Sequence, residues 1–510
     1  MTSQVKQFST SLEKLLKGFV DAANLNDKFN KITVEGLSLD SRSIKDGYLF
    51  LAIKGETVNG IEFINNAIEQ GAVAVLWDAS AEVDAINLNW RKSLSGKDVP
   101  IIAVEKLQKL TGEIASRFYD EPSLKLPVCG VTGTNGKTSC ADFIAQMMSI
   151  DAPCGLMGTL GRGVYPGLTE TGYTTPDAIT CHQWLADVEL SNAKFAVMEV
   201  SSHALIQGRV NGIQFNSAVF TNLSRDHLDF HGDMQSYADA KTMLFKTAGL
   251  KNAIINIDDE AGRNIVDELA KEIQCIRYGL NENYKPDVFA TDVQLNEQGL
   301  SMQVITPWGR GQLQAPVIGG FNASNLLAVL SVMLIQGIDF DESLKRLKTI
   351  KSVAGRMQRF GGDACPLVIV DFAHTPDALA QALTSLRQHT QHNLWCVFGC
   401  GGDRDKGKRP LMGAVAEENA DYIVLTNDNP RYENPDMIID DIKAGISSNT
   451  NVSVEQDRQA AIHFAIKQAK AGDVVLIAGK GHENYQLVGE EKYPFDDAEE
   501  VQHQLEVCAG

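Results

Sequence analysis

The sequence lacks a long apolar run. No stretch of about 18 consecutive apolar residues occurs in its 510 residues, so we expect no membrane-spanning helix. The N-terminus, MTSQVKQFSTSLEKLL, has neither an unbroken apolar core nor a small-residue cleavage site, and it is not expected to act as a signal peptide. These absences predict a cytoplasmic protein.

Positive charge is also scarce. Lys and Arg number 46 against 65 Asp and Glu, which gives a formal net charge of −19. Proteins that bind nucleic acid non-specifically carry a basic footprint, so no nucleic-acid partner is expected. An anionic ligand would have to be bound by local groups of Lys, Arg and backbone N–H donors.

Paired cysteines are missing as well. The nine cysteines are scattered, and the only close pair, Cys396 and Cys400, has three intervening residues instead of the two of a zinc knuckle. We expect reduced thiols, as in a cytosolic protein.

Length and pattern predict three α/β domains, since domains usually contain about 100–200 residues. The polar segment DEPSLKLP reads as a linker, and the predicted domains are residues 1–125, 126–354 and 355–510. In the first, YLFLAIKG and VAVLWD are expected to be strands on either side of the helix IEFINNAIEQGA.

The second region is expected to begin with a strand, a glycine loop and a helix in VCGVTGTNGKTSCADFIAQMMS. FAVMEVSS and NAIINIDD have the β-branched composition of strands, and residues 293–319 alternate like antiparallel strands. Residues 321–337 are predicted to form an apolar helix capped by Gly337.

The third region alternates apolar strands with helices such as TPDALAQALTSLRQ. The runs LVIVDF, LWCVFGCGG, YIVLTND and VVLIAGK predict a parallel sheet covered on both faces. Ligands of such sheets bind at the carboxyl ends of the strands, where DFAHTPD, GCGGDRDKGKR, NDNPR and GKGHE follow.

The segment Gly130–Ser139 has the composition of a phosphate-binding loop. Its glycines allow backbone N–H groups to turn inward, and the following helix adds partial positive charge. Lys137 would reach the β- and γ-phosphates and Thr138 would face Mg²⁺. Val131 departs from the pattern G-x4-G-K-[ST], and a plain glycine turn is the alternative. The predicted ATP-binding residues of this loop are Gly133, Thr134, Asn135, Gly136, Lys137, Thr138 and Ser139.

Two acidic and histidine-rich stretches follow, MEVSSHAL and FTNLSRDHLDFHGDMQSYADAKTMLF. Carboxylate oxygens suit Mg²⁺, which usually takes further ligands from water and phosphate. A solvated acidic loop is the alternative reading of their composition.

These motifs together resemble the Mur ligase family, which shares its ATP loop with the folylpolyglutamate synthases. The resemblance extends from Asp40-Ser41-Arg42 to GHENYQ, nearly the whole chain. It implies a UDP-binding α/β domain, a central P-loop-type ATPase domain with a mostly parallel sheet, and a C-terminal Rossmann-like domain. It also implies Lys137, Lys241 and His227 as catalytic residues, and Mg²⁺ bound by Thr138, Glu199, His227 and Lys241 carboxylated on its side-chain nitrogen.

The resemblance also implies a UDP-muramoyl-dipeptide site. On local evidence alone, the DSR segment is an ordinary turn and Arg209 a surface arginine. Glu56-Thr57-Val58 departs from the His-Gln-Ala-like run that is frequent in the family. The implied contacts are Leu39, Ser41, Thr174, Thr175, Ser201, Gln207 and Arg209.

The last region carries the remaining implied contacts. Asn322, Arg356 and Asp371 would contact the nucleotide. DNPR by itself is a turn, but in a ligase its Arg431 would pair with a carboxylate, which meso-diaminopimelate has at its far end and lysine lacks. The implied meso-diaminopimelate contacts are Arg404, Asp428, Asn429, Pro430, Arg431, Gly479 and Glu483.

The reaction implied is ATP-dependent addition of meso-diaminopimelate to the D-glutamate of UDP-N-acetylmuramoyl-L-alanyl-D-glutamate through an acyl phosphate, by a chain expected to be a monomer. The alternatives are a lysine-adding ligase of the same family, a folylpolyglutamate synthase-like ligase and, from another class, a P-loop NTPase switch or motor. Arg431 argues against lysine, and the DSR segment argues against the folate enzyme.

Overall fold

The structure is a computed structural model that describes residues 7–20, 27–55, 58–79, 89–362, 364–447 and 451–509. Glu56 and Thr57, which belong to the segment that differs from the family pattern, lie outside this range. Within the described residues, no helix is both long and apolar enough to cross a membrane. The chain divides into two compact units: a first unit of residues 1–137, 148–254 and 261–275, and a second unit of residues 138–147, 255–260 and 276–510.

The first unit begins with a five-stranded sheet of order β3-β4-β5-β7-β6. Alternate residues of β4 face opposite cores: Leu49 and Leu51 pack against helix α4, whereas Phe50 and Ala52 pack against α3. The two strands and the helix predicted here are confirmed. The bounds are β3 Gly36–Ser38, β4 Tyr48–Ala52, η2 Gly60–Phe63, α3 Ile64–Glu69, β5 Ala74–Asp78, β6 Asn89–Lys92, β7 Asp98–Val104 and α4 Leu107–Phe118.

An eleven-stranded sheet has the order β11-β10-β9-β12-β8-β13-β14-β15-β16-β17-β18. Every residue of β8 is buried, and β8 pairs in parallel with β12 on one side and β13 on the other. The loop after β8 therefore starts beside the carboxyl ends of both neighbours. The bounds are β8 Val128–Thr132, α6 Lys137–Met148, β9 Cys154–Gly158, β10 Gly161–Val164, β11 Gly167–Thr169, α7 Ala178–Leu190, β12 Phe195–Glu199, α8 Ser202–Ile206, β13 Ser217–Phe220, α9 Leu228–His231, α10 Met234–Thr242, β14 Asn252–Asn256, α11 Glu260–Glu268 and β15 Gln274–Gly279.

The alternating segment forms the predicted antiparallel strands, β16, β17 and β18. The apolar helix α12 follows, and Gly337 lies just after it at φ 86°, a left-handed conformation that glycine adopts without strain. Both predictions are confirmed. The bounds are β16 Val288–Asn296, β17 Gly299–Thr306, β18 Gly309–Ala315, α12 Asn322–Ile335 and α13 Phe340–Leu347.

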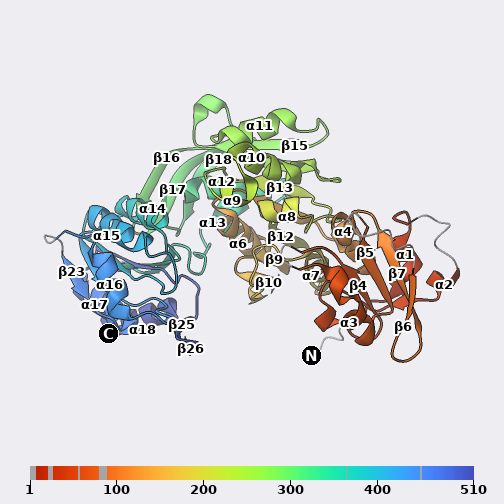
Figure 1. Cartoon of the computed structure of the whole chain (residues 1–510). Helices are drawn as coiled ribbons and strands as arrows, with labels where there is room; N and C mark the ends of the chain where they lie inside the picture. Colours follow the sequence, from red (N-terminus) through yellow and green to blue (C-terminus); the bar gives the residue numbers. More distant parts are fainter. Residues whose placement is uncertain are drawn as a thin grey trace. The chain divides into compact units, whose positions relative to one another are not determined.

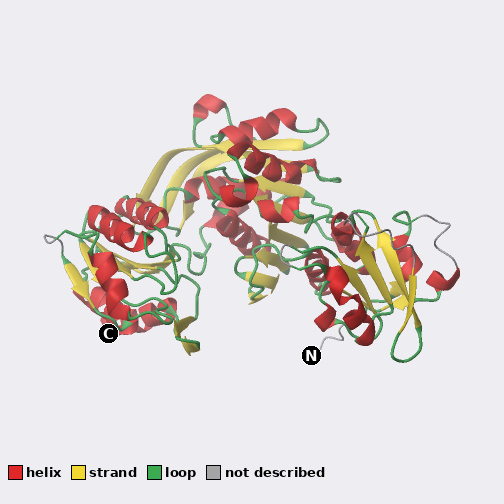
Figure 2. Ribbon diagram, in the orientation of Figure 1, coloured by secondary structure: helices red, strands yellow, loops and turns green. Residues whose placement is uncertain are grey.

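The second unit ends in a six-stranded sheet of order β19-β20-β24-β21-β22-β23, in which only the edge strand β19 is antiparallel. Leu367 and Ile369 of β20 face the core under α14, α15 and α16, while Val368 and Val370 face the core under α17 and α18. Helices therefore cover both faces, as predicted (Figures 1 and 2). The bounds are β19 Gln358–Gly361, β20 Leu367–Asp371, α14 Pro376–Arg387, β21 Leu394–Phe398, α15 Lys408–Asn419, β22 Tyr422–Leu425, α16 Pro435–Lys443, β23 Val452–Val454, α17 Arg458–Gln468, β24 Val474–Ala478, β25 Tyr485–Val488, β26 Glu491–Pro494 and α18 Asp497–Ala509.

Short elements complete the described chain. The segment read as a linker contains a single helical turn, α5, that begins at a proline, the residue whose fixed φ suits the first helical position. The bounds are β1 Thr10–Ser11, α1 Leu12–Leu16, α2 Asp27–Asn30, β2 Thr33–Val34, η1 Ser41–Ser43, α5 Pro122–Lys125, η3 Met243–Lys246 and η4 Glu282–Tyr284.

Candidate active site

The glycine loop between β8 and α6 depends on Gly133. Its φ is 149°, and a Cβ there would lie 1.9 Å from the hydroxyl oxygen of Thr221, so no larger residue fits. The Lys137 ammonium donates to the carbonyl oxygens of Gly133 (2.9 Å) and Thr134 (2.8 Å). The loop thus holds a cation against its own backbone, as a phosphate-binding loop does.

The chain after β13 braces this loop, which the sequence did not reveal. Asn222 accepts from the Asn135 N–H (2.9 Å), and its backbone carbonyl accepts from the Thr134 N–H (2.8 Å). The Thr221 hydroxyl donates to the Asn135 carbonyl (2.6 Å). The parallel pairing of β8 with β13 brings these residues together. Asn222 lies in the segment FTNLSRDHLDFH, whose composition alone gives no sign of this role.

Lys241 is buried beside the same loop. Its side chain, on α10, donates to the Gly133 carbonyl (2.8 Å), and only 1% of the residue is exposed. Burial, together with the positive charge of Lys137, lowers the pKa of Lys241 to about 6. A large fraction of Lys241 is therefore neutral near pH 7, which is the form of an amine that attacks CO₂.

Glu199 ends β12 and is also buried. One carboxylate oxygen accepts from the Thr159 N–H (2.7 Å), and a Cβ on Gly158 would lie 2.2 Å from that oxygen. The Thr174 hydroxyl lies 3.2 Å from the Thr159 hydroxyl. The Thr175 hydroxyl donates to the Glu199 carbonyl (2.9 Å). The two predicted threonines therefore lie beside the predicted metal ligand.

Helix α8 follows directly, and three predicted contacts flank it. Ser201 caps the helix by accepting from the Ala204 N–H (3.2 Å), and its own N–H donates to the Thr175 hydroxyl (3.1 Å). Gln207 is the C-cap residue of the helix. Arg209 donates to the Thr175 carbonyl (2.9 Å), so it is tied to the same loop instead of extending as a surface arginine.

Aromatic and imidazole rings gather over this region. His227 has φ 51° and lies in the turn before α9, with its ring centroid 4.9 Å from that of His203 and 6.1 Å from that of Tyr237. The His227 Nε2 is 3.5 Å from an Asp226 carboxylate oxygen. Burial and the neighbouring charges of His203 and Lys241 lower the pKa of His231. The region therefore offers imidazole and carboxylate groups together.

Leu39 and Ser41 belong to a different element of the first unit. They follow β3, and Leu39 packs partly against the core under α4. Ser41 is 4% exposed and begins the 3₁₀ turn that Asp40 caps. Asp40 also pairs with Arg42 (2.7 Å), and this contact lowers the Asp40 pKa. The DSR segment is thus a capped turn.

In the second unit, the predicted nucleotide contacts have local partners. The Asn322 amide donates to the Ile318 carbonyl (2.7 Å) and is 4% exposed. The Arg356 guanidinium lies 5.1 Å from the Phe372 ring centroid. Asp371 accepts from the Met357 N–H (2.7 Å), and burial raises its pKa. The side-chain N–H group of Asn322 is therefore already hydrogen-bonded within the fold.

The loops after β22 and β24 meet through a buried network. The Asn429 amide donates to Glu483 Oε2 (3.0 Å), and Lys480 donates both to Asn429 Oδ1 (3.1 Å) and to the same Glu483 oxygen (3.3 Å). Lys480 is fully buried and was not singled out in the sequence, although it lies inside the GKGHE motif. Gly479 has φ 117°, a conformation that favours glycine, and a Cβ there would also come within 2.7 Å of an Asp428 carboxylate oxygen.

Arg431 is the last residue of the DNPR segment and has φ 50°. Its guanidinium donates to the Gly402 carbonyl (2.8 Å). A Cβ on Gly401 would be 2.9 Å from this guanidinium and 3.8 Å from Cγ of Arg404, so the two predicted arginines flank one glycine. Pro430 is buried between Asn429 and Arg431, and its fixed φ stiffens the turn.

Comparisons with known sequences identify the family. The description "Mur ligase family, catalytic domain" matches residues 33–119, "Mur ligase middle domain" matches residues 131–333, and "Mur ligase, glutamate ligase domain" matches residues 355–481. A UDP-N-acetylmuramoyl-L-alanyl-D-glutamate–2,6-diaminopimelate ligase from Coxiella burnetii is 47% identical over 496 residues, covering 96% of this chain and 99% of the relative. The chain belongs to the Mur ligase family.

Solved structures place this Mur ligase in the same fold. A UDP-N-acetylmuramoyl-L-alanyl-D-glutamate–2,6-diaminopimelate ligase superposes with a TM-score of 0.75 at 34% identity, covering 98% of this chain and 100% of that one. Folylpolyglutamate synthase from Mycobacterium tuberculosis, complexed with ADP and AMPPCP, has a TM-score of 0.57 at 18% identity, with 72% of this chain and 91% of that chain covered. The second likeness concerns the fold alone. The predicted α/β class and family are confirmed, while the exact domain boundaries stay a prediction.

Proposed function

We propose that this Mur ligase joins an amino group of meso-2,6-diaminopimelate to the D-glutamate γ-carboxylate of UDP-N-acetylmuramoyl-L-alanyl-D-glutamate, using ATP. The observation that carries the proposal is the pair of arginines flanking Gly401 together with the Asn429–Lys480–Glu483 network. The far end of meso-diaminopimelate has both a carboxylate and an ammonium. A guanidinium suits the first and a carboxylate suits the second, whereas lysine offers only the ammonium.

Glu483 is suited to receive that ammonium. Its bonds from Asn429 and Lys480 both reach Oε2, so Oε1 would accept from the substrate. Arg431 and Arg404 would pair with the distal carboxylate, while Asp428 and Gly479 shape the space between the loops.

ATP would bind on the loop at Gly133–Lys137, with Thr138 and Ser139 at the start of α6. The backbone N–H groups and Lys137 would neutralise the triphosphate. By the family resemblance, Asn322, Arg356 and Asp371 would also contact the nucleotide. Glu199, His227, Thr138 and a carboxylated Lys241 would offer donors that are mostly oxygen atoms, which suit Mg²⁺. The ion would supply charge neutralisation for the phosphates.

Lys241 would be modified by CO₂. Its neutral amine nitrogen attacks the CO₂ carbon, forms the C–N bond and releases one proton, which leaves a carbamate anion. The buried neutral amine next to Lys137 would thereby be exchanged for an anion, which the Lys137 ammonium attracts.

The reaction would proceed in two steps. The γ-carboxylate of D-glutamate attacks the γ-phosphorus, and ADP leaves with the electrons of the broken bond. The amine then attacks the acyl-phosphate carbonyl carbon, loses a proton and expels inorganic phosphate. Arg209, Ser201, Thr174, Thr175 and Gln207 would hold the dipeptide, and Leu39 and Ser41 the UDP end. The protein would contribute to catalysis by positioning the reactants and by stabilising the charge that develops.

An amino acid screen tests the proposal. The purified chain is incubated with ATP, Mg²⁺, the UDP-dipeptide and single amino acids, while phosphate release and product mass are recorded. We expect turnover with meso-diaminopimelate and little with L-lysine, in line with a cytoplasmic precursor pathway. Faster turnover with L-lysine, turnover only with a folate acceptor, or phosphate release without any acceptor would contradict it.

A further inference from the structure

Arg458, the first residue of α17, is a buried cation outside every motif. Its side chain and that of Asp497, the first residue of α18, are both 0% exposed. Nε donates to one Asp497 carboxylate oxygen (2.7 Å) and Nη2 to the other (2.7 Å), a paired geometry that fixes the guanidinium plane.

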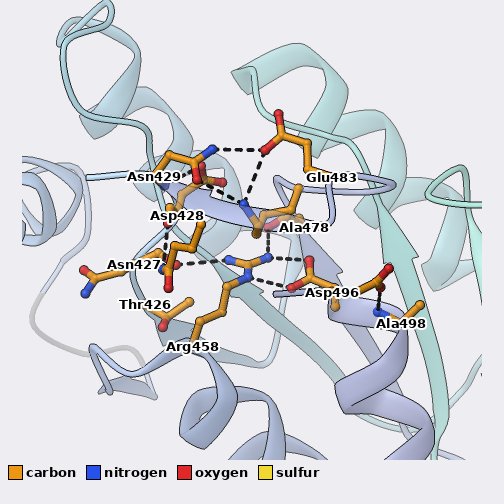
Figure 3. Close-up of polar contacts among 12 residues, drawn as sticks. Thr426, Asn427, Asp428, Asn429, Arg458, Ala478, Glu483, Asp496 and Ala498 are labelled. Atoms are coloured by element: carbon orange, nitrogen blue, oxygen red, sulfur yellow. Dashed lines mark hydrogen bonds and ion pairs between the residues drawn. The ribbon is translucent and has the colours of Figure 1, made fainter. Parts of the chain in front are cut away.

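The opposite edge of this guanidinium faces two backbone carbonyls. Nη2 also donates to Ala478 (3.0 Å), the last residue of β24, and Nη1 to Asn427 (3.4 Å), which follows β22 (Figure 3). These strands are not neighbours, because β21 lies between them. Arg458 therefore ties together the starts of the two loops that carry Asp428 and Gly479.

A second buried arginine ties the next pair of loops. The Arg409 guanidinium, on α15, is fully buried and donates to Glu433 (2.9 and 3.0 Å) and Asp441 (2.9 Å). It also reaches the Gly401 carbonyl (3.4 Å). Glu433 in turn accepts from the Asp403 N–H (2.6 Å). Arg409 thus joins the loop of Arg404 to the segment after Arg431.

Stability alone is a poor explanation for such ion pairs. Removing two charges from water costs about as much as their attraction returns, and apolar replacements are often as stable. A guanidinium instead contributes orientation, because several hydrogen bonds from one rigid plane hold several groups in fixed positions at once.

We propose that Arg458 and Arg409 are positioning residues for the amino acid substrate, which together set the distance between the arginines flanking Gly401 and the Glu483 carboxylate. This inference rests on the proposed function. Neither residue contacts substrate; each acts through the loops that do.

The test compares Arg458→Lys, Asp497→Asn and Asp441→Asn with the wild type. Lysine keeps the charge but cannot donate to three residues in one plane. Asp441 is half-exposed, so its variant stays folded even if the others are weakened. We expect the KM for meso-diaminopimelate to rise about 10-fold or more for the Arg458 and Asp497 variants and less for the Asp441 variant, with the KM for ATP unchanged.

Asp473→Asn is the matched control, because Asp473 is 3% exposed and binds backbone N–H groups at the opposite end of the same strand β24. It should lower the melting temperature without changing the amino acid KM. An unchanged meso-diaminopimelate KM in all three test variants, or an equal rise in the control, would overturn the positioning role. Absence of turnover by the wild type would instead contradict the proposed function.

An independent observation concerns the middle of the same helix pair. His463 on α17 and Glu500 and His503 on α18 hold their potential ligand atoms within 4.8 Å of one another. The buried His463 Nε2 makes no hydrogen bond and lies 3.2 Å from a Glu500 carboxylate oxygen. Gln459 donates to that oxygen (2.6 Å) and so orients it.

We infer that these three residues form a binding site for a divalent transition metal, since two imidazoles and one carboxylate are a donor set that Zn²⁺ prefers. Calorimetric titration of the full chain with ZnCl₂ tests it. His463→Gln and His503→Gln should each weaken one binding event about 10-fold or more, without changing ligase turnover. No zinc binding by the wild type, or wild-type affinity for zinc in both variants, would refute the site.

Discussion

Two lysine nitrogens share the Gly133 carbonyl oxygen, and their different surroundings predict different chemistry. Lys241 is the more deeply buried, with a pKa near 6. We expect Lys241→Ala to lose at least about 100-fold in kcat and to be partly rescued by short-chain carboxylic acids, which would supply the missing anion. Steady-state phosphate release measures both effects.

The exposed neighbour Lys246, which pairs with Glu268, is the control, and Lys246→Ala should behave as wild type. Below pH 6 the Lys241 amine is protonated and cannot attack CO₂, so a CO₂-dependent gain in activity should fade as the pH falls through this value. Full activity of Lys241→Ala without added acid would disprove the carbamate.

A second prediction at the residue scale concerns the Arg431 side chain and the amino acid substrate. Its guanidinium is held at the Gly402 carbonyl, where a substrate carboxylate would meet it. Arg431→Ala should raise the KM for meso-diaminopimelate about 10-fold to 100-fold, which corresponds to a charge-assisted hydrogen bond of about 1.5–3 kcal/mol, and leave the KM for ATP unchanged. Arg310→Ala, on an exposed position of β18, should change neither constant. Equal effects on both constants would argue against a role in amino acid selection.

At the scale of elements, the phosphate loop depends on the chain that follows β13. Asn222→Ala removes both side-chain bonds to Asn135 while leaving Lys137 in place. The loop should then lose its fixed shape, and the KM for ATP should rise while the KM for meso-diaminopimelate stays constant. Isothermal titration with ADP gives the same comparison at equilibrium. Asn281→Ala, which removes only the cap of η4, should leave nucleotide affinity unchanged; a matching loss there would contradict the bracing role.

The elements themselves could be predicted from apolar runs, as for β4, β20 and β24, because a fully buried strand must be apolar on both faces. Contiguous motifs likewise placed Glu199 at the end of a strand, and Lys137 and Arg431 in segments that follow strands. Arg458 and Asp497 could not be found this way, because they lie 39 residues apart in sequence and meet only through the packing of α17 on α18. Lys480 and Asn222 lie within recognisable motifs, but their roles could not be predicted. Each bonds to a residue that follows a different strand, Asn429 after β22 and Asn135 after β8.

At the scale of the whole molecule, acid should destabilise the fold through buried histidines. His182 is fully buried; one ring nitrogen donates to the Asn211 carbonyl (2.9 Å), while Nδ1 makes no hydrogen bond, so protonation would bury an unpaired charge. Burial lowers its pKa to about 4. Because the folded pKa lies below the unfolded value of about 6.5, stability is complete above pH 6.5 and is lost as the pH falls toward 4, by up to about 3 kcal/mol.

Denaturant unfolding at several pH values measures this loss. His182→Gln should be less stable near pH 7 but should show a shallower decline between pH 6.5 and 4. The exposed His392 supplies the control variant, His392→Gln, whose decline should match the wild type. A wild-type slope in His182→Gln would assign the acid sensitivity to other groups.

The route of the chain between its two compact units has a consequence for synthesis on the ribosome. The first unit needs residues up to 275, and residues 138–147, made early, belong to the second unit, which continues to residue 510. Residues 138–147, which make up nearly all of α6, must therefore remain without their packing partners until much later parts of the chain are translated. A prematurely released fragment ending near residue 275 would expose the apolar side of that helix, which makes such fragments natural targets for chaperones and proteases.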